Sequence, residues 1–236
     1  MLARQCNYEF ESSSLPLSKY KDDDRGVEGF LNGLPETTER VVAAREYIFC
    51  EGDAKTHLYE VKTGAVCISK ISIDGSRQVI KFALSGDVIG LGSQENYDTY
   101  AQATTLTKLK ALSYASLRRI IQEDTTFSMK LWEMMTEELT ATRNLVVTVG
   151  QRSAPQRIAT FLLNMQERNR RQNLDSNTIV LLMTRSDIAD YLGLTIETVS
   201  RTLTKFKLQK IIDIVENRHV TILNFDKLED LAEGDI

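Results

Sequence analysis

The side chains best suited to chemistry in this sequence are Glu197, Ser200 and Arg201. Their spacing of three and four residues places them one turn apart on one side of a helix. Arginine can donate two hydrogen bonds to guanine, glutamate can accept one from cytosine, and serine can bond to either kind of base edge. On an isolated helix the simpler interpretation is a surface ion pair between Glu197 and Arg201, worth about 0.3–0.5 kcal/mol. The secondary-structure elements that carry these residues decide between the two interpretations, a surface that contacts bases and a surface ion pair.

The segment 184–208 predicts two short helices joined by a tight turn. Thr184 and Asp187 have the spacing of a capping box at the start of the first helix, and Gly193 ends that helix. Thr195 is a favourable N-cap for the second helix, and the small Ala189 suits two helices that cross at a steep angle, as in a helix-turn-helix. The expected buried faces are Ile188, Ala189 and Leu192 in the first helix and Val199, Leu203 and Phe206 in the second.

A helix-turn-helix favours the DNA interpretation, so Glu197, Ser200 and Arg201 are the expected base contacts. Polar neighbours are expected to contact phosphates, which positions the helix without reading sequence. These expected phosphate contacts are Arg185, Ser186, Thr195, Thr198 and Lys205. Apolar runs at 211–215 and 220–223 then predict a β-hairpin, or wing, and Arg218 at its tip is a further expected phosphate contact.

The formal net charge of −4 is unevenly distributed. Residues 151–225 carry 11 Lys+Arg against 7 Asp+Glu, residues 1–150 carry 17 against 21, and residues 226–236 carry one against five. A basic segment inside an acidic chain is consistent with a surface that faces phosphates, although this signal is weak by itself.

Short apolar runs separated by glycines at about 40–113 predict a small β-barrel or roll. Asp74-Gly75 between two apolar runs is a strong hairpin signal, because both residues tolerate a positive φ. The polar residues 1–28 are expected to form a flexible arm, after which Leu31 and Leu34 could begin a short helix.

Residues 125–150 predict one long helix with an apolar stripe. The stripe consists of Leu131, Met135, Leu139, Thr142, Leu145, Val146 and Val149. It could pack on the β-roll of the same chain or pair with a second copy across a twofold axis. The two arrangements are compatible, since Phe127, Met129, Trp132 and Met134 could serve a second face.

Composition and motifs exclude several classes of protein. No apolar run approaches the roughly 18 residues of a membrane span and the N-terminus has no signal core, so we expect a cytoplasmic protein with no membrane partner. Three scattered cysteines and two distant histidines favour neither a metal site nor a disulfide framework. With no P-loop, complete dinucleotide fingerprint or nucleophile elbow, we do not expect an enzyme.

The order of these elements resembles the cyclic-AMP receptor/fumarate-nitrate regulator (CRP/FNR) superfamily of bacterial transcription factors. Over roughly residues 40–225, the roll signature consists of Gly52-Asp53, the run 58–64 and the run 86–90. We therefore expect an α+β fold with an arm at 1–28, a cyclic-nucleotide-binding-like β-roll at 29–124, a dimerisation helix at 125–150 and a winged helix-turn-helix domain at 151–236. The resemblance implies a homodimer that binds a palindromic promoter site in double-stranded DNA and acts with RNA polymerase.

This sequence departs from the ligand-binding motifs of the superfamily, and these differences indicate which branch of the superfamily it resembles. Aligned by Gly90, the positions that hold a cyclic nucleotide in relatives are Leu91 and Tyr97-Asp98 here, so no arginine faces the cyclic phosphate. Of the N-terminal cysteine set that holds an iron–sulfur cluster, only Cys6 is present. The run 197–201 is similar to the Glu-x-x-Ser-Arg of the FNR and FixK branch. The resemblance thus implies a FixK-like activator of microaerobic or nitrogen-fixation genes that uses no cofactor and reads TTGAT-N4-ATCAA-like sites.

A second hypothesis keeps the same fold and assumes that a signal regulates DNA binding. The β-roll could bind an unidentified small molecule, or a thiol in it could be oxidised. The candidate redox residues are Cys67 on a roll strand and Cys50 near Gly52, although buried thiols are commonly inert.

Overall fold

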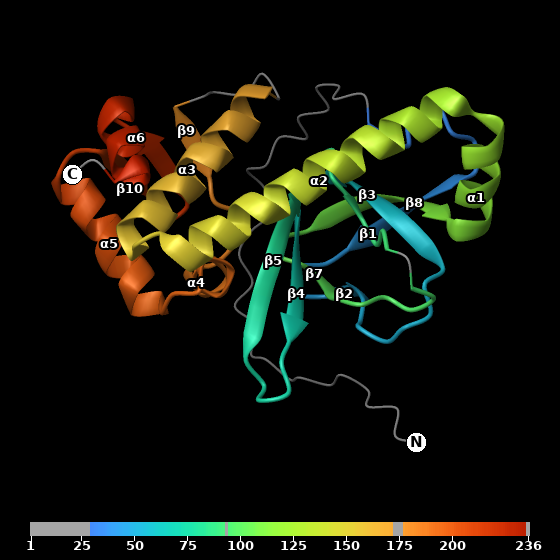
Figure 1. The fold of residues 1–236 in the computed structure, drawn as a ribbon, viewed down its shortest axis with the longest axis horizontal. Helices are drawn as coiled ribbons and strands as arrows, with labels where there is room; N and C mark the ends of the chain where they lie inside the picture. Colours follow the sequence, from blue (N-terminus) through green and yellow to red (C-terminus); the bar gives the residue numbers. More distant parts are fainter. Residues whose placement is uncertain (1–28, 93, 172–176, 235–236) are drawn as a thin grey trace.

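The structure, a computed structural model, describes residues 29–92, 94–171 and 177–234, and the expected arm at 1–28 lies outside this part of the chain. Figure 1 shows a β-rich part and a helix-rich part, which the long helix α2 (Thr125–Gln151) connects. The fold is α+β, as the sequence predicts.

Eight strands form the β-roll. They are β1 (Thr37–Val42), β2 (Tyr47–Phe49), β3 (His57–Thr63), β4 (Ala65–Ile71), β5 (Arg77–Leu84), β6 (Val88–Ile89), β7 (Tyr100–Ala103) and β8 (Thr107–Ser113). They pair antiparallel in two four-stranded sheets, with the orders β1-β8-β3-β6 and β2-β7-β4-β5. Apolar side chains from both sheets, among them Val61, Val66 and Leu109, are buried together as the core of the roll.

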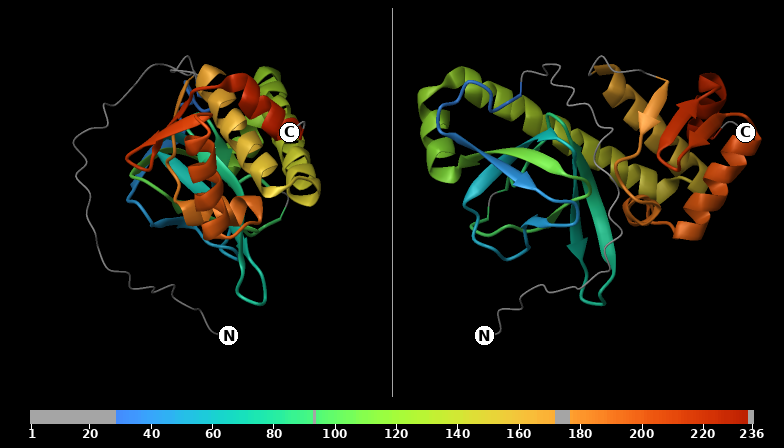
Figure 2. Two further views of the ribbon diagram at one scale, coloured as in Figure 1. Left: turned by 90° about the vertical axis from the view of Figure 1, so that its left-hand side faces the viewer. Right: turned by 180° about the vertical axis from the view of Figure 1, so that it is seen from behind.

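The hairpin predicted at Asp74-Gly75 joins β4 to β5. Ile71 pairs with Arg77, and within the turn the positive φ falls on Gly75, at +86°. The Asp74 carboxylate accepts hydrogen bonds from the backbone N–H and the hydroxyl of Ser76, at 3.0 and 2.7 Å. This turn chemistry keeps the two strands in register, and the hairpin projects from the roll (Figure 2).

Asp124 divides the helical segment after the roll into two helices. α1 (Tyr114–Glu123) begins at the N-cap Ser113, and Asp124 caps α2 by accepting a hydrogen bond from the backbone N–H of Phe127 at 2.9 Å. The 27 residues of α2 span about 40 Å, so the predicted long helix is confirmed, and it runs from α1 past the roll to the C-terminal part (Figures 1 and 2). Like the other helices of the described residues, it lacks the apolar length needed to cross a membrane.

The first described residues form turns, so the short helix expected at Leu31 and Leu34 is wrong. The buried Glu60 explains the difference, because its Oε2 accepts a hydrogen bond from the backbone N–H of Leu31 at 2.8 Å. Lys62 adds a hydrogen bond to the side chain of Asn32 at 3.0 Å. These bonds to the roll take the place of helical ones and anchor the segment.

Seven elements make up the C-terminal part. They are α3 (Ala154–Arg171), β9 (Thr178–Val180), α4 (Arg185–Leu192), α5 (Ile196–Leu208), β10 (Ile212–Val215), β11 (His219–Ile222) and α6 (Phe225–Glu233). The sheet order β10-β11-β9 adds a third strand to the predicted wing. A further helix, α6, was not predicted from the sequence; it packs on α3 and buries Leu228 and Ala232.

One apolar cluster extends from the roll into the C-terminal part. Cys67, Val79 and Phe82 are buried in the same cluster as side chains of α3, α4 and α5. The ring of Phe82 lies 6.3 Å from that of Phe161 on α3 and 5.1 Å from that of Tyr191 on α4, between centroids. The two parts therefore share a core, and β5 lies against α4.

Candidate nucleic-acid interface

The helix-turn-helix forms from the local hydrogen bonds that the sequence predicts. Thr184 Oγ1 accepts from the backbone N–H of Asp187 at 3.1 Å, and Asp187 Oδ2 accepts from that of Thr184 at 2.9 Å, so the capping box is complete. Gly193 ends α4 in the left-handed region, with a φ of +62°, which favours glycine. Thr195 caps α5 by accepting from the backbone N–H of Thr198 at 3.2 Å.

The faces expected to be buried are confirmed. The six residues are Ile188, Ala189 and Leu192 on α4 and Val199, Leu203 and Phe206 on α5, all at most 3% exposed. Because α5 buries this side, its opposite side faces solvent at the outer edge of the molecule (Figure 1).

Glu197, Ser200 and Arg201 are all exposed on α5, so the structure brings together the three expected base contacts. A hydrogen bond from its own backbone N–H, and then one from the Thr195 hydroxyl, lower the pKa of Glu197, with a smaller contribution from the charge of Arg201. Glu197 is therefore a carboxylate at neutral pH, which suits an acceptor for a base amino group.

The expected phosphate contacts lie around α5. Ser186, Thr195, Lys205 and Arg218 are exposed, and Thr198 is half-buried with its hydroxyl 3.1 Å from that of Thr195. They come from the starts of α4 and α5, the last turns of α5 and the wing, so they surround the base-contact candidates as a backbone-binding rim would.

Arg185 differs from the other expected phosphate contacts. Its Nη2 donates to the carbonyl oxygen of Asn217 at the wing tip, at 3.3 Å, whereas its Nη1 is enclosed and has no hydrogen-bond partner. Burial lowers the pKa of this guanidinium. Arg185 therefore braces the wing against the start of α4, and its contact with a phosphate stays a prediction.

The predicted wing is confirmed. Glu216 and Asn217 have φ values of +52° and +57°, and the N–H of Arg218 donates to Val215 O at 3.2 Å, as in a tight hairpin turn. Lys207 on α5 ties the helix to the wing, because its Nζ donates to Ile214 O at 2.9 Å. The wing thus has a fixed place beside α5 and exposes Arg218.

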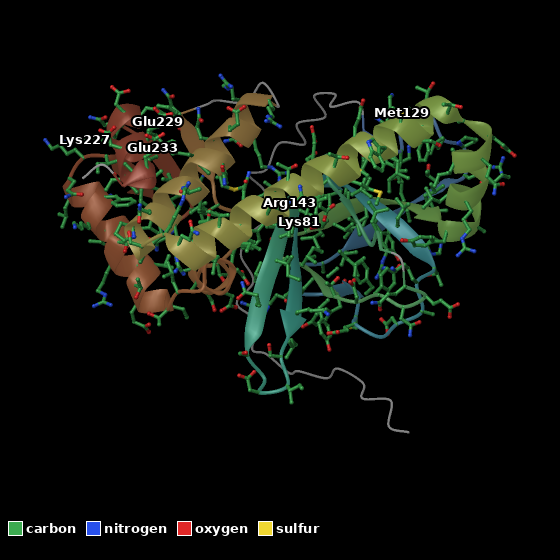
Figure 3. The ribbon with its side chains drawn as sticks, viewed as in Figure 1. Lys81, Met129, Arg143, Lys227, Glu229 and Glu233 are labelled. Atoms are coloured by element: carbon green, nitrogen blue, oxygen red, sulfur yellow. The ribbon has the colours of Figure 1, made fainter. Side chains whose placement is uncertain are left out.

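The acidic end of the chain lies away from α5. Figure 3 shows Lys227, Glu229 and Glu233 on α6, at the upper edge of the C-terminal part, whereas α5 lies at the lower edge. Charges on opposite sides of a domain interact weakly, because salt screens them over about 8 Å at physiological ionic strength. This separation makes the net charge of −4 compatible with a surface that faces phosphates.

A stripe of large apolar side chains is exposed along α2. It consists of Met129, Trp132, Met135, Leu139 and Val146, which are 49% to 67% exposed. Together with the exposed Thr142, the last four follow each other at steps of three and four residues, the spacing of a coiled-coil seam. The stripe therefore has the pattern of a surface that pairs with another helix.

The structure corrects the expected composition of this stripe. Leu131 is only 8% exposed and packs with Phe127 against the roll and α1, so it faces its own chain. Met129 and Trp132, expected to serve a second face of the helix, belong instead to the exposed stripe. Leu145 and Val149 are half-buried. Val149 lies close to Gly193 at the end of α4, so it faces its own chain at least in part.

Lys81 on β5 holds the middle of α2 to the roll. Its Nζ pairs with Glu138 at 3.2 Å. Figure 3 shows Lys81 below the middle of α2, between the labelled Met129 near one end of the helix and the C-terminal part. The helix thus packs one face on its own roll and leaves another face exposed. This agrees with the prediction that packing on the roll and pairing with a second copy are compatible.

Aromatic side chains fill the interior of the roll around Tyr97, one of the positions that the resemblance aligns with cyclic-nucleotide contacts. Tyr97 is buried, stacks on Phe49 with 3.8 Å between ring centroids, and donates its hydroxyl to His57 O at 2.5 Å. Burial raises the pKa of Tyr97 to about 12. Leu91 packs partly buried beside α1 and α2. Leu91 and Tyr97 are uncharged and the exposed Asp98 is an acid, so none of these positions offers a positive charge for a cyclic phosphate.

The two candidate redox cysteines have different surroundings. Cys67 is fully buried in the shared core, and burial raises its pKa to about 12, although the nearby Arg77 acts in the opposite direction. Since the thiolate is the reactive form, the surroundings of Cys67 are those of an inert thiol. Cys50 is half-buried. Among the residues that the structure describes, no three potential metal ligands gather.

Sequence reasoning missed Arg77 on β5. Its Nη1 lies 2.7 Å from Asp187 Oδ1 and 3.1 Å from Asp190 Oδ2, both on α4. Asp187 was expected only as a capping residue. No local pattern connects residues 110 positions apart, so only the tertiary structure reveals this contact.

Comparisons with known proteins agree with this geometry. The Crp-like helix-turn-helix domain matches residues 156–231, and the Cyclic nucleotide-binding domain matches residues 39–124. The "Nitrogen fixation regulation protein FixK" of Bradyrhizobium diazoefficiens is 37% identical over 79% of this chain and 78% of its own length.

Two further similarities extend over most of the chain. The "Transcriptional activator protein Anr" of Pseudomonas protegens is 30% identical over 94% of this chain and 89% of its own. The solved structure of FixK2 from Bradyrhizobium japonicum is similar with a TM-score of 0.77 and 36% identity, covering 83% of this chain and 96% of that one.

Proposed function

The chain belongs to the CRP/FNR family of DNA-binding transcriptional regulators, and on this premise we propose that it activates transcription as a homodimer on a TTGAT-N4-ATCAA-like site. The observation that carries the proposal is the exposed face of α5, where Glu197, Ser200 and Arg201 stand together. Relatives of this kind are transcription factors and not enzymes.

The chemistry of α5 supports the choice of site. The N-terminal part of a recognition helix lies in the major groove, where Arg201 would donate two hydrogen bonds to guanine O6 and N7. Glu197, kept ionised, would accept from the cytosine amino group. Lys205 and Arg218 would contact phosphates on either side and add affinity that depends on salt.

The exposed stripe of α2 supports the homodimer. Full burial of a large apolar side chain contributes about 1.5–3 kcal/mol, and these side chains, which are 49% to 67% exposed, would gain part of that on an identical stripe, less the cost of association. A twofold axis along α2 would place two copies of α5 on half-sites one helical turn apart, about 34 Å. The palindrome then mirrors the symmetry of the protein.

The packed roll supports a regulator that binds DNA without a cyclic nucleotide, because Phe49 and Tyr97 occupy its interior. The similarity to FixK and Anr proteins supports activation of microaerobic or nitrogen-fixation genes through contact with RNA polymerase. Transcription in vitro from a promoter that carries the site tests the activating role directly.

Binding to the palindrome is tested with purified protein and no added ligand. Fluorescence anisotropy compares a TTGAT-N4-ATCAA duplex with a scrambled duplex over a range of salt concentrations. We expect one dimer per duplex, a preference of at least about 10³-fold and a steep fall of affinity with salt. Weak binding that is indifferent to sequence would contradict the proposed site.

A further inference from the structure

Two consecutive residues of β5 hold α4 by hydrogen bonds. The Arg77 guanidinium lies between two carboxylates and donates from Nη1 to Asp187 at 2.7 Å and to Asp190 at 3.1 Å. Gln78 donates from Nε2 to the backbone oxygen of Asp190 at 2.6 Å. All three charged side chains are partly buried, so water screens these contacts less than it screens an exposed ion pair.

Asp187 uses its two carboxylate oxygens for different contacts. Oδ2 accepts from the backbone N–H and the hydroxyl of Thr184, at 2.9 and 2.7 Å, and completes the cap of α4. Oδ1 accepts from Arg77. The carboxylate that completes the capping box of α4 is therefore also bonded to the β-roll, so α4 cannot turn away from β5 without losing a hydrogen bond of Asp187.

A second ion pair joins the same two parts with the charges reversed. Arg168 on α3 donates to Asp87, in the turn before β6, at 2.6 Å. The same oxygen of Asp87 accepts from the backbone N–H of Leu84 at 2.8 Å, so this carboxylate also shapes a turn. Between the two ion pairs, Phe82 packs on Phe161 and Tyr191. Contacts to both α3 and α4 resist rotation of the C-terminal part on the roll.

We propose that Arg77 is a positioning residue for DNA binding: from the β-roll it sets the orientation of α4, and through α4 that of α5, relative to α2. The inference rests on the proposed homodimer and its palindromic site. In a dimer held together by α2, the separation of the two α5 helices depends on how each C-terminal part sits on its own roll and α2. One added base pair moves a half-site by about 3.4 Å and turns it about the DNA axis, so a fixed orientation selects one spacer length.

This role differs measurably from general support of the fold. A contact that only stabilises the fold changes the fraction of active protein, which scales binding to every duplex equally. A contact that orients α5 changes the ratio of affinities for different spacers. Because Arg77 is not among the expected phosphate contacts, we expect its loss to leave the number of those contacts, and therefore the salt dependence, unchanged.

The test compares Arg77→Gln with Lys70→Gln and the wild type. Lys70 lies on the same hairpin, is exposed and pairs with Glu51 at 3.6 Å, so this control removes the same charge without touching α4. Each protein is titrated with the four-base-spacer duplex and with duplexes one base pair shorter or longer. We expect the wild type and Lys70→Gln to prefer the four-base spacer by about tenfold or more, and Arg77→Gln to bind all three within about threefold.

Hydrogen exchange of residues 184–192 without DNA gives a second measurement. We expect faster exchange in Arg77→Gln than in Lys70→Gln. If Arg77→Gln does not fold, Arg77→Lys replaces it, since lysine keeps the charge without the planar fork and is expected to weaken the spacer preference partly. An unchanged spacer preference in a folded Arg77 variant, or unchanged exchange of α4, overturns the inference. Failure of the wild type to bind the palindrome overturns the proposed function instead, and the exchange comparison then decides whether Arg77 holds α4.

Discussion

Arg77 and Asp187 lie 110 residues apart in the sequence and 2.7 Å apart in the structure. Burial alone would raise the pKa of Asp187, but hydrogen bonds from Arg77 and then from Thr184 outweigh it, so the pKa is lowered. Asp190 contacts the same guanidinium at 3.1 Å, yet burial dominates and its pKa is raised. One arginine thus serves two carboxylates, of which only Asp187 is stabilised in its charged form.

This difference predicts different effects of two similar substitutions on the free energy of unfolding. Asp187→Asn removes the nearer of the two charged partners of Arg77 and weakens the capping box, so we expect it to lower the free energy of unfolding at neutral pH by about 1–2 kcal/mol. Asp190→Asn is the matched control and is expected to be neutral or slightly stabilising. Chemical denaturation of both variants measures the effect, and equal losses would contradict the assignment.

The pH dependence follows from the same pKa directions. A carboxyl whose pKa is lowered in the folded state contributes stability above its unfolded value of 3.8, and this contribution is lost as the pH falls through the lower, folded value. The difference in melting temperature between the wild type and Asp187→Asn should therefore be largest near neutral pH and shrink in acid. A constant difference would show that the charge of Asp187 is not its source.

Replacement of Arg201 tests direct reading of a base. Arg201→Ala is expected to cost about 1–3 kcal/mol of binding free energy and to relax the preference at one base pair in each half-site. Lys205→Ala, on the same helix, is expected to weaken binding to all sequences alike and to reduce the salt slope by about one for each subunit. Anisotropy titrations with single-base variants of the duplex distinguish the two. An unchanged base preference in Arg201→Ala would refute the assigned contact.

The exposed stripe of α2 predicts the oligomeric state. Leu139→Asp places a charge in the middle of the stripe, and burying that charge against a second copy is costly, so we expect a monomer that binds the palindrome weakly. Asn144→Asp adds the same charge to an exposed position of α2 outside the stripe and should remain dimeric. Sedimentation equilibrium measures both. A dimeric Leu139→Asp protein would mean that another surface holds the dimer.

The surroundings of the cysteines predict their reactivity. With a pKa of about 12, Cys67 is almost entirely protonated at neutral pH and is buried, so a thiol-alkylating reagent should modify Cys50 much faster than Cys67 in the folded protein. Peptide mass spectrometry in a Cys6→Ser background follows the two sites. Full unfolding should make their rates similar. Equal rates in the native protein would restore Cys67 as a candidate redox sensor.

The sequence by itself determined the helix-turn-helix and the residues that α5 exposes. Thr184, Asp187, Gly193 and Thr195 act through hydrogen bonds and φ angles within a few positions, and the apolar spacing shows which side of each helix is buried. The Asp74-Gly75 hairpin and the long helix follow from similarly local signals. Short-range interactions of this kind can be predicted from a sequence because the interacting residues are close together in it.

Only the tertiary structure decided how these elements meet. Leu131 and Trp132 are adjacent and both apolar, and the position of the roll alone determines that Leu131 is buried and Trp132 exposed. The partners of Arg77 come from packing of β5 against α4, which no local periodicity encodes. Contacts between distant segments depend on the summed burial of many side chains, so a single pair leaves no signal in one sequence. The surface proposed to read DNA was therefore predictable from the sequence, and the contacts proposed to orient it were not.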